Sequence, residues 1–260
     1  MQGRALVTGG AQRLGRAMAT YLAGRGFDVA VHYASSSEAA DSLVSEIAAM
    51  GRHAVALQAD LLDEQATAGL VARAAEGLGG ALTCLINNAS IFEHDTLASA
   101  TAESWHRHIG SNLRAPFVLT QAFAAQAPGA VTDAGGEPVA TGLVINMIDQ
   151  RVLKPTPEFM TYTIAKMALW AFTRTAAQGL APGIRVNAIG PGPTLRGARQ
   201  SAEHFVRQRA ATVLERGADA ADICAALGYF LDARAVTGQL LCIDGGQHLA
   251  WATPDVLGIE

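Results

Sequence analysis

The sequence alternates along almost its whole length between short apolar runs and longer stretches with helical spacing of apolar residues. The short runs are rich in β-branched residues, as buried strands are, and the stretches between them repeat apolar residues every three or four positions. This alternation predicts a doubly wound α/β fold, a seven-stranded parallel sheet flanked by helices on both faces. We expect strands at 5–8, 28–33, 53–58, 84–87, 143–147, 185–189 and 240–243, and helices near 13–25, 36–50, 63–77, 101–126, 156–180, 195–215 and 219–232.

The chain has no sign of a boundary between domains. No composition shift, linker or internal repeat divides its 260 residues, and the only long connection rich in Gly and Pro lies at 128–141. Half of the residues are hydrophobic and 16% are charged, values that exclude a disordered chain and a coiled coil. We therefore expect residues 1–260 to form a single domain that buries a core without disulfides or a structural metal.

Net charge and cysteine content indicate which binding partners and which cellular compartment to expect. The net charge is −4 and Lys and Arg form no cluster, so we expect neither a nucleic acid nor a membrane as partner. The three cysteines are far apart, which excludes a disulfide framework and a CxxC metal site. The N-terminus has no apolar signal segment, and the longest charge-free run, 115–132, contains Pro and Gln and indicates a buried helix. We expect a cytoplasmic protein with a small-molecule substrate.

A glycine-rich turn follows the first expected strand directly. It runs TGGAQRLG over residues 8–15, and the next helix begins inside it. Glycines let the backbone approach a pyrophosphate closely, and the free N–H groups at the start of a helix favour its charge. The turn predicts a nucleotide site built from Gly9, Arg13, Leu14 and Gly15. Because the spacing is not GxGxxG, a tight strand–helix connection without a ligand is the alternative.

The end of the second expected strand indicates which nucleotide binds. Sites for NAD place a carboxylate here to hold the ribose hydroxyls, but this chain has HYASSS at 32–37 and no acid before Glu38. Serine hydroxyls, together with Arg13, can instead donate hydrogen bonds to a 2′-phosphate. We therefore expect NADP(H), unless the serines only cap the next helix. The candidate residues are His32, Tyr33, Ser35 and Ser36.

Lysine is rare in this chain, so the position of each one is informative. There are only two, and Lys166 lies four residues after Tyr162. That spacing puts both side chains on the same face of a helix, where an ammonium can lower the pKa of a phenol from about 10 and make it a usable acid. A Tyr-x-x-x-Lys pair is common by chance, so its weight depends on the other motifs.

Together these motifs resemble the short-chain dehydrogenase/reductase family over essentially the whole chain. The matching segments are TGGAQRLG at 8–15, QADL at 58–61, NNAS at 87–90, Asn112, Tyr162 with Lys166, RVN at 185–187, PG at 191–192 and DGG at 244–246. The resemblance implies a Rossmann-like fold in which Lys166 holds the nicotinamide ribose and Asn112 orients a water that relays protons. It also implies that the cofactor is lined by Asp60, Leu61, Asn88, Ala89, Ser90, Lys166, Pro191 and Gly192.

Two positions depart from the general family pattern. Arg13 replaces the middle glycine of the turn, and Asp149 stands thirteen residues before Tyr162, where a serine is usual. That serine donates a hydrogen bond to a carbonyl oxygen as the oxygen becomes negative. An ionised carboxylate cannot donate, and its charge opposes an alkoxide. It suits a substrate that has N–H groups or that takes a proton on a ring nitrogen.

Both departures resemble the pteridine reductases, a branch of the family with TGxxxRxG at the turn and an aspartate in the serine position. That branch carries an aromatic ring at the position of Phe92, which stacks on the pterin opposite the nicotinamide. The resemblance implies an NADPH-dependent reductase of dihydropterin or dihydrofolate-like rings. Its catalytic residues are Asp149, Tyr162, Lys166 and Asn112, and its substrate residues are Phe92, Arg13, Ser90, Asp149 and Tyr162. Ala34 and Ser35 replace basic residues of better-known members, and Phe159 replaces a second tyrosine, which affects the range of substrates.

Other interpretations stay open. A carbonyl or 3-oxoacyl reductase would tolerate serine at position 149, and a non-catalytic NADP-binding sensor would need no activated phenol. Phe92 could pack a loop, and Asp149 could be a solvated acid. Segment 194–216, which contains five arginines, is either a substrate lid or an exposed helix. By analogy with the family, and because the tail at 249–260 is apolar, we expect a homotetramer.

Overall fold

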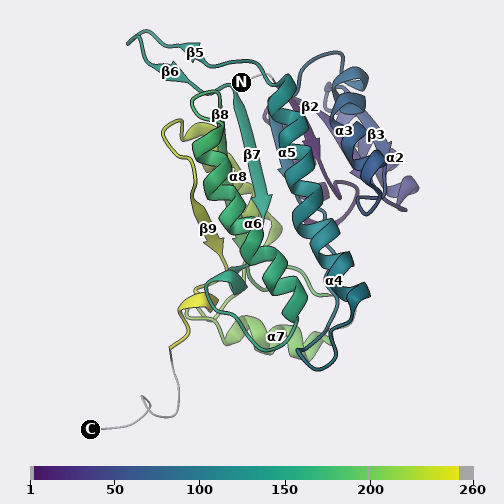
Figure 1. Cartoon of the computed structure of the whole chain (residues 1–260), viewed down its shortest axis with the longest axis vertical. Helices are drawn as coiled ribbons and strands as arrows, with labels where there is room; N and C mark the ends of the chain where they lie inside the picture. Colours follow the sequence, from purple (N-terminus) through teal and green to yellow (C-terminus); the bar gives the residue numbers. More distant parts are fainter. Residues whose placement is uncertain (1–2, 198–199, 252–260) are drawn as a thin grey trace.

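Seven parallel strands form the central sheet of the structure (Figure 1), a computed structural model that describes residues 3–197 and 200–251. The strand order is β3-β2-β1-β4-β7-β8-β9, so the chain begins in the middle of the sheet and winds outward in both directions. This order confirms the doubly wound α/β fold. The strands are β1 (Gly3–Val7), β2 (Phe27–Tyr33), β3 (Ala54–Gln58), β4 (Cys84–Asn87), β7 (Gly142–Met147), β8 (Ile184–Pro191) and β9 (Leu240–Ile243).

Helices cover both faces of the sheet because successive strand residues point to opposite sides. In β1, Ala5 and Val7 pack into one core cluster, whereas Leu6 packs into the other. The helices of the first face are α1 (Arg13–Gly24), α2 (Ser37–Ala49) and α8 (Ala220–Asp232). Those of the second face are α3 (Glu64–Gly77), α5 (Ala115–Gln126) and α6 (Met160–Gly179).

Three helices differ from the expectation. The helix expected at 101–126 divides into α4 (Ala102–Ile109), a π-helical turn (Gly110–Arg114) and α5. Pro116 has no N–H to bond the carbonyl four residues earlier, which accounts for the change of winding. The segment expected to be helical at 195–215 is helical only in α7 (Ala202–Ala210), and α6 begins at Met160 rather than 156. Two short 3-10 helices span Gln150–Val152 and Gln247–Leu249.

The connection at 128–141 contains an antiparallel hairpin that the sequence did not indicate. Its strands, β5 (Val131–Thr132) and β6 (Pro138–Val139), project beyond the amino-terminal end of β7 (Figure 1). The carboxyl ends of the sheet strands lie at the opposite edge, on the side of α7. Ligands of such sheets bind at the carboxyl edge, so the hairpin is remote from the expected site. In the described part of the chain, no helix combines the length and apolar character that a membrane crossing requires.

Candidate active site

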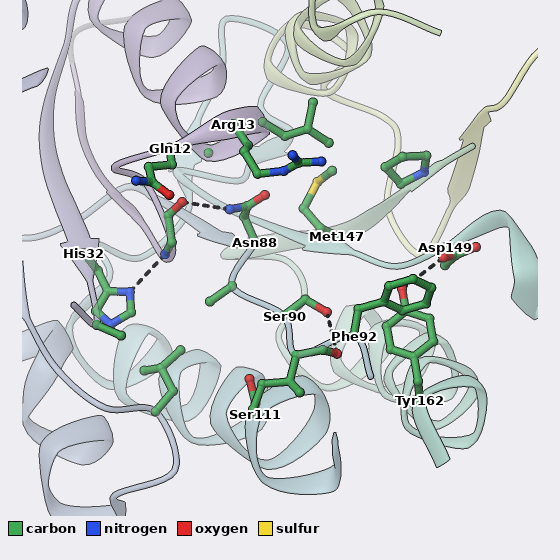
Figure 2. A pocket seen from close by; sticks show the side chains of 18 of the residues that line it. Gln12, Arg13, His32, Asn88, Ser90, Phe92, Ser111, Met147, Asp149 and Tyr162 are labelled. Carbon is green, nitrogen blue, oxygen red and sulfur yellow. Dashed lines mark hydrogen bonds between the residues drawn. The ribbon is translucent and has the colours of Figure 1, made fainter. Parts of the chain in front are cut away.

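A cavity of about 850 Å³ opens at the carboxyl ends of β1, β2, β4, β7 and β8 (Figure 2). This volume is within the ordinary range of ligand pockets. Three expected site residues, Tyr33, Ser36 and Asn112, do not line the cavity. The expected residues that do are Gly9, Arg13, Leu14, Gly15, His32, Ser35, Asp60, Leu61, Asn88, Ala89, Ser90, Phe92, Asp149, Tyr162, Lys166, Pro191 and Gly192.

The glycine-rich turn needs glycine where the backbone passes closest to itself. Gly9 has a φ of 59°, and a Cβ atom on Gly15 would lie 2.0 Å from the carbonyl oxygen of Gly9. Any side chain at position 15 would push α1 away from the turn. Asn88 braces the turn from the end of β4, because its amide donates to the carbonyls of Thr8 and Gly9. The N-terminus of α1 therefore presents a fixed backbone cradle that fits a pyrophosphate.

His32 anchors the same turn from β2. Its Nδ1 accepts a hydrogen bond from the N–H of Gly9 at 3.0 Å, and its Nε2 lies 3.1 Å from the carbonyl oxygen of Ala59. Because Nδ1 accepts, the ring proton is on Nε2, which donates to Ala59. Burial lowers the pKa of His32, so the ring is neutral and keeps both bonds near neutral pH.

Beyond His32, the cavity continues toward the ends of β2 and β3. Ser35 and Gln58 line this part, and the Gln58 amide donates to the carbonyl of Ala34 at 3.1 Å. Tyr33 packs against the hydrophobic core instead of the cavity. Ser36 is at the N-cap of α2 but makes no side-chain capping hydrogen bond, so capping does not explain that serine.

Arg13 extends toward the other end of the cavity. Its φ of 53° is a left-handed conformation, which costs a residue with a side chain about 1 kcal/mol. Its guanidinium donates to the carbonyl oxygens of Leu195, at 3.2 Å, and Arg196, at 3.0 Å. In Figure 2 the side chain points away from His32 and toward the β7 side of the cavity. The expected contact of Arg13 with a 2′-phosphate stays a prediction.

Asp149 and Tyr162 are in direct contact. The Tyr162 hydroxyl donates to Oδ2 of Asp149 at 2.9 Å, and the N–H of Arg151 donates to Oδ1 at 2.8 Å. Asp149 follows the end of β7 by two residues, and Tyr162 lies in the first turn of α6. The strand end and the helix start therefore bring together the two residues that the sequence analysis chose as proton donors.

Burial dominates the ionisation of these residues. It raises the pKa of Tyr162 well above 10, with the charge of Asp149 adding to the rise, and it raises the pKa of Asp149 above 3.8. Lys166 donates from Nζ to the carbonyl of Met147 at 2.8 Å, and burial lowers its pKa to about 8. Burial and the charge of Asp149 set the direction of the Tyr162 shift here, and the expected activation of the phenol by Lys166 stays a prediction. Tyr162 keeps its proton at neutral pH.

Two phenylalanines, Phe92 and Phe159, lie beside Asp149 and Tyr162, and we call them the aromatic wall. The rings of Phe92 and Phe159 are stacked, with centroids 4.2 Å apart and planes 6° apart. Tyr162 meets Phe92 edge-on at 4.7 Å. Phe92 is 44% exposed and lines the cavity, so it does more than pack a loop. A planar ring system fits against such a surface.

Asn112 lies fully buried behind the cavity. Its Oδ1 accepts from the N–H of Ile91 at 2.9 Å, and its Nδ2 donates to the carbonyl of Ile91 at 2.8 Å. The side chain thus holds the segment just before Phe92. The expected role of Asn112 in orienting a water of the proton relay stays a prediction.

The lining also includes residues that the sequence analysis did not single out. Gln58 ends β3, and Met147 and Ile148 lead from β7 to Asp149, so the rule that ligands bind at strand ends points to them. Arg107 and Ser111 come from α4 and the π-helical turn, and no local sequence pattern marks them. The others are Gln12, Leu62 and Ile91; Ala34, Thr194 and Leu195 also line the cavity, at positions that the sequence analysis had named.

Of the described residues of segment 194–216, Thr194 and Leu195 line the cavity and the others do not. None of the residues of α7 is buried. Arg209 donates to the carbonyls of Pro193 and Ala218 at 3.0 and 2.6 Å, which fixes one end of the segment. The expected closing of this segment over a substrate stays a prediction. Arg199 and the tail at 252–260 lie outside the described residues.

Comparisons with known proteins agree with the geometry. The family described as short chain dehydrogenase matches residues 4–206. A solved structure, FolM alternative dihydrofolate reductase 1 from Brucella suis in complex with NADP, is 42% identical, with a TM-score of 0.90 and 98% of each chain covered. The uncharacterized oxidoreductase MT0954 from Mycobacterium tuberculosis is 35% identical, covering 93% of this chain and 90% of the relative. The 3-oxoacyl-[acyl-carrier-protein] reductase FabG from Staphylococcus aureus is 29% identical, covering 94% and 98%. The chain therefore belongs to the short-chain dehydrogenase/reductase family.

Proposed function

We propose that this protein is an NADPH-dependent reductase of dihydropterin rings, including dihydrofolate-like molecules. The observation that carries the proposal is the hydrogen bond from Tyr162 to Asp149 beside the aromatic wall. Ketone reduction needs a donor for the developing oxyanion, whereas the carboxylate of Asp149 accepts hydrogen bonds. The Brucella relative, whose name is dihydrofolate reductase and which holds NADP, supports the same substrate class.

The residues at the strand ends fit NADPH, which supplies the hydride when bound. The cradle around Gly9 and Gly15 receives the pyrophosphate at the N-terminus of α1. Ser35 and Gln58 offer polar groups to the 2′-phosphate, and the ammonium of Lys166 holds the nicotinamide ribose.

Tyr162 and Asp149 provide the proton for the reaction. Reduction of a ring C=N bond to CH–NH needs one hydride on carbon and one proton on nitrogen. Tyr162 is protonated at neutral pH because its pKa is well above 10. The raised pKa of Asp149 lets this carboxyl group take up and return a proton closer to neutral pH than an exposed aspartate does. The hydrogen bond between them is a direct path for that proton.

The aromatic wall orients the substrate. A flat heterocycle stacked against Phe92 keeps its reducible bond at a fixed height above the catalytic pair, and such positioning contributes to rate. The ring also excludes water from one face of the substrate.

A substrate panel tests the proposal. NADPH oxidation is measured with dihydrobiopterin, dihydrofolate, acetoacetyl thioesters and simple ketones at equal concentrations. We expect turnover of at least one dihydropterin and little turnover of the ketones. Faster reduction of the acetoacetyl thioester would replace the proposal with its second candidate, a 3-oxoacyl reductase, which the likeness to FabG favours. Binding of NADPH with no turnover of any compound would favour a cofactor-binding sensor.

We also propose the cytoplasm as the compartment and a homotetramer as the assembly. The family resemblance supports both. The outer side of α5 and α6 supports the assembly, because Phe117, Ile164 and Met167 are exposed there.

A further inference from the structure

A buried polar cluster joins three segments behind the aromatic wall. It consists of the side chains of Asp95, Ser104, His108 and Thr161, and we call it the anchor cluster. Asp95 follows Phe92 on the loop after β4, Ser104 and His108 belong to α4, and Thr161 lies in the first turn of α6. Asp95, His108 and Thr161 are almost fully buried. Burying a polar group without a hydrogen bond costs free energy, so loss of any one hydrogen bond in the cluster would destabilise this arrangement.

The hydrogen bonds of the anchor cluster run in one direction. The hydroxyl of Thr161 donates to Oδ2 of Asp95, so its oxygen is left to accept from Nδ1–H of His108 at 2.7 Å. Nε2 of that ring then has no proton and accepts from the backbone N–H of Glu93 at 3.1 Å. Asp95 also accepts from the N–H of Thr161 at 3.2 Å and from Oγ of Ser104 at 3.1 Å.

Both ends of this chain of bonds reach the aromatic wall. Glu93, whose N–H is held by His108, is the residue after Phe92. The carbonyl of Asp95 accepts from the N–H of Phe159 at 2.7 Å, at a residue with a φ of 56°. The anchor cluster therefore holds the backbone next to Phe92 through His108, and it fixes Asp95, whose own backbone carbonyl holds the N–H of Phe159.

We propose that Asp95, His108 and Thr161 are positioning residues that set the aromatic wall for a planar heterocyclic substrate. The proposal rests on the proposed function. The glycine-rich turn is held separately, by Asn88 and His32. Loss of the anchor cluster should therefore weaken binding of the heterocycle and leave NADPH binding unchanged.

Thr161 is the best test position, because His108 also packs edge-on against the Tyr162 ring at 6.0 Å. Thr161→Val keeps the shape of the side chain but removes the hydroxyl that links Asp95 to His108. Thr161→Ser keeps the hydroxyl. The matched control is Thr173→Val, on the same helix, where a fully buried hydroxyl donates to Leu169 and accepts from Asn146.

The readouts are kcat and KM for the best dihydropterin, and the Kd of NADPH by fluorescence titration. For Thr161→Val we expect KM to rise about tenfold, kcat to change less than about threefold, and the Kd to stay the same. Thr161→Ser should restore KM, and Thr173→Val should leave KM near the wild-type value. Equal effects of the two valine variants, or a fall in kcat at constant KM, would overturn the proposal.

Two further measurements test the role of the anchor cluster if Thr161→Val does not fold or if the wild-type enzyme reduces no pterin. If Thr161→Val does not fold, Asp95→Asn, which keeps the shape but loses one acceptor oxygen, is expected to give the same rise in KM. If the wild-type enzyme reduces no pterin, the proposed function fails by itself. A crystal structure of the variant then decides about the anchor cluster, since an unchanged stack of Phe92 on Phe159 would contradict its positioning role.

Discussion

At the residue scale, the carboxylate of Asp149 is the feature that our proposal uses to distinguish a pterin substrate from a ketone. Both of its oxygens accept hydrogen bonds, from Tyr162 and from the N–H of Arg151. We expect Asp149→Ser to reduce dihydropterin turnover by about 100-fold, because the proton path to the ring nitrogen is lost. Ketone reduction should stay equal or rise, since a serine can donate to an oxyanion. The exposed acid Asp41, changed to serine, is the control.

The pKa of Lys166 predicts the basic limb of the pH profile. Burial lowers this pKa to about 8, so the ammonium loses its proton as the pH rises through that value. If the ammonium holds the nicotinamide ribose, kcat/KM for NADPH should fall above about pH 8. The arginine of Lys166→Arg keeps its charge at every accessible pH. In that variant the fall of kcat/KM should therefore move to higher pH, although the activity at the optimum is lower. A limb that stays near pH 8 in the variant would assign it to another group.

At the element scale, the close passage of α1 over the glycine-rich turn makes a sharp prediction. Gly15→Ala puts a Cβ 2.0 Å from the carbonyl oxygen of Gly9, so α1 must shift. We expect NADPH binding to weaken by about tenfold or more. Gly24→Ala in the same helix is the control, because its Cβ would meet nothing nearer than Met50 at 3.7 Å. Fluorescence titration of NADPH measures both variants, and equal affinities would show that the turn tolerates the change.

Elements set by local pattern were predictable, and elements set by distant contacts were not. The seven strands of the sheet lie within two residues of their expected positions, because buried β-branched runs mark them. The start of α6 was missed, since Phe159 is held in a left-handed conformation by the carbonyl of Asp95, far away in the sequence. At the site, the resemblance to the family pattern put Asp149 beside Tyr162, and the two side chains are in contact. Their ionisation depends on burial, which neither a motif nor its spacing contains.

At the scale of the whole molecule, an apolar surface on α5 and α6 bears on assembly. Phe117 is 48% and Met167 42% exposed, and Phe117 lies 5.2 Å from Phe172 of α6. We expect light scattering to give a mass near four chains, and Met167→Glu to give a smaller species. Val131→Glu, at an exposed apolar residue of the hairpin, is the control. A wild-type monomer would rule out the tetramer.

The hairpin of β5 and β6 stands at the edge of the sheet farthest from the cavity (Figure 1). Its tip, between Thr132 and Pro138, is exposed and closed by Asp133, whose carboxylate accepts from the N–H groups of Gly135 and Glu137. A peptide tag inserted at this tip should leave kcat and KM within about twofold of the wild-type values, because loop tips tolerate insertion. The hairpin tip is therefore a suitable site for attaching the protein to a surface or to a fluorescent reporter. In either case the opening of the cavity would face away from the attachment point, toward solvent.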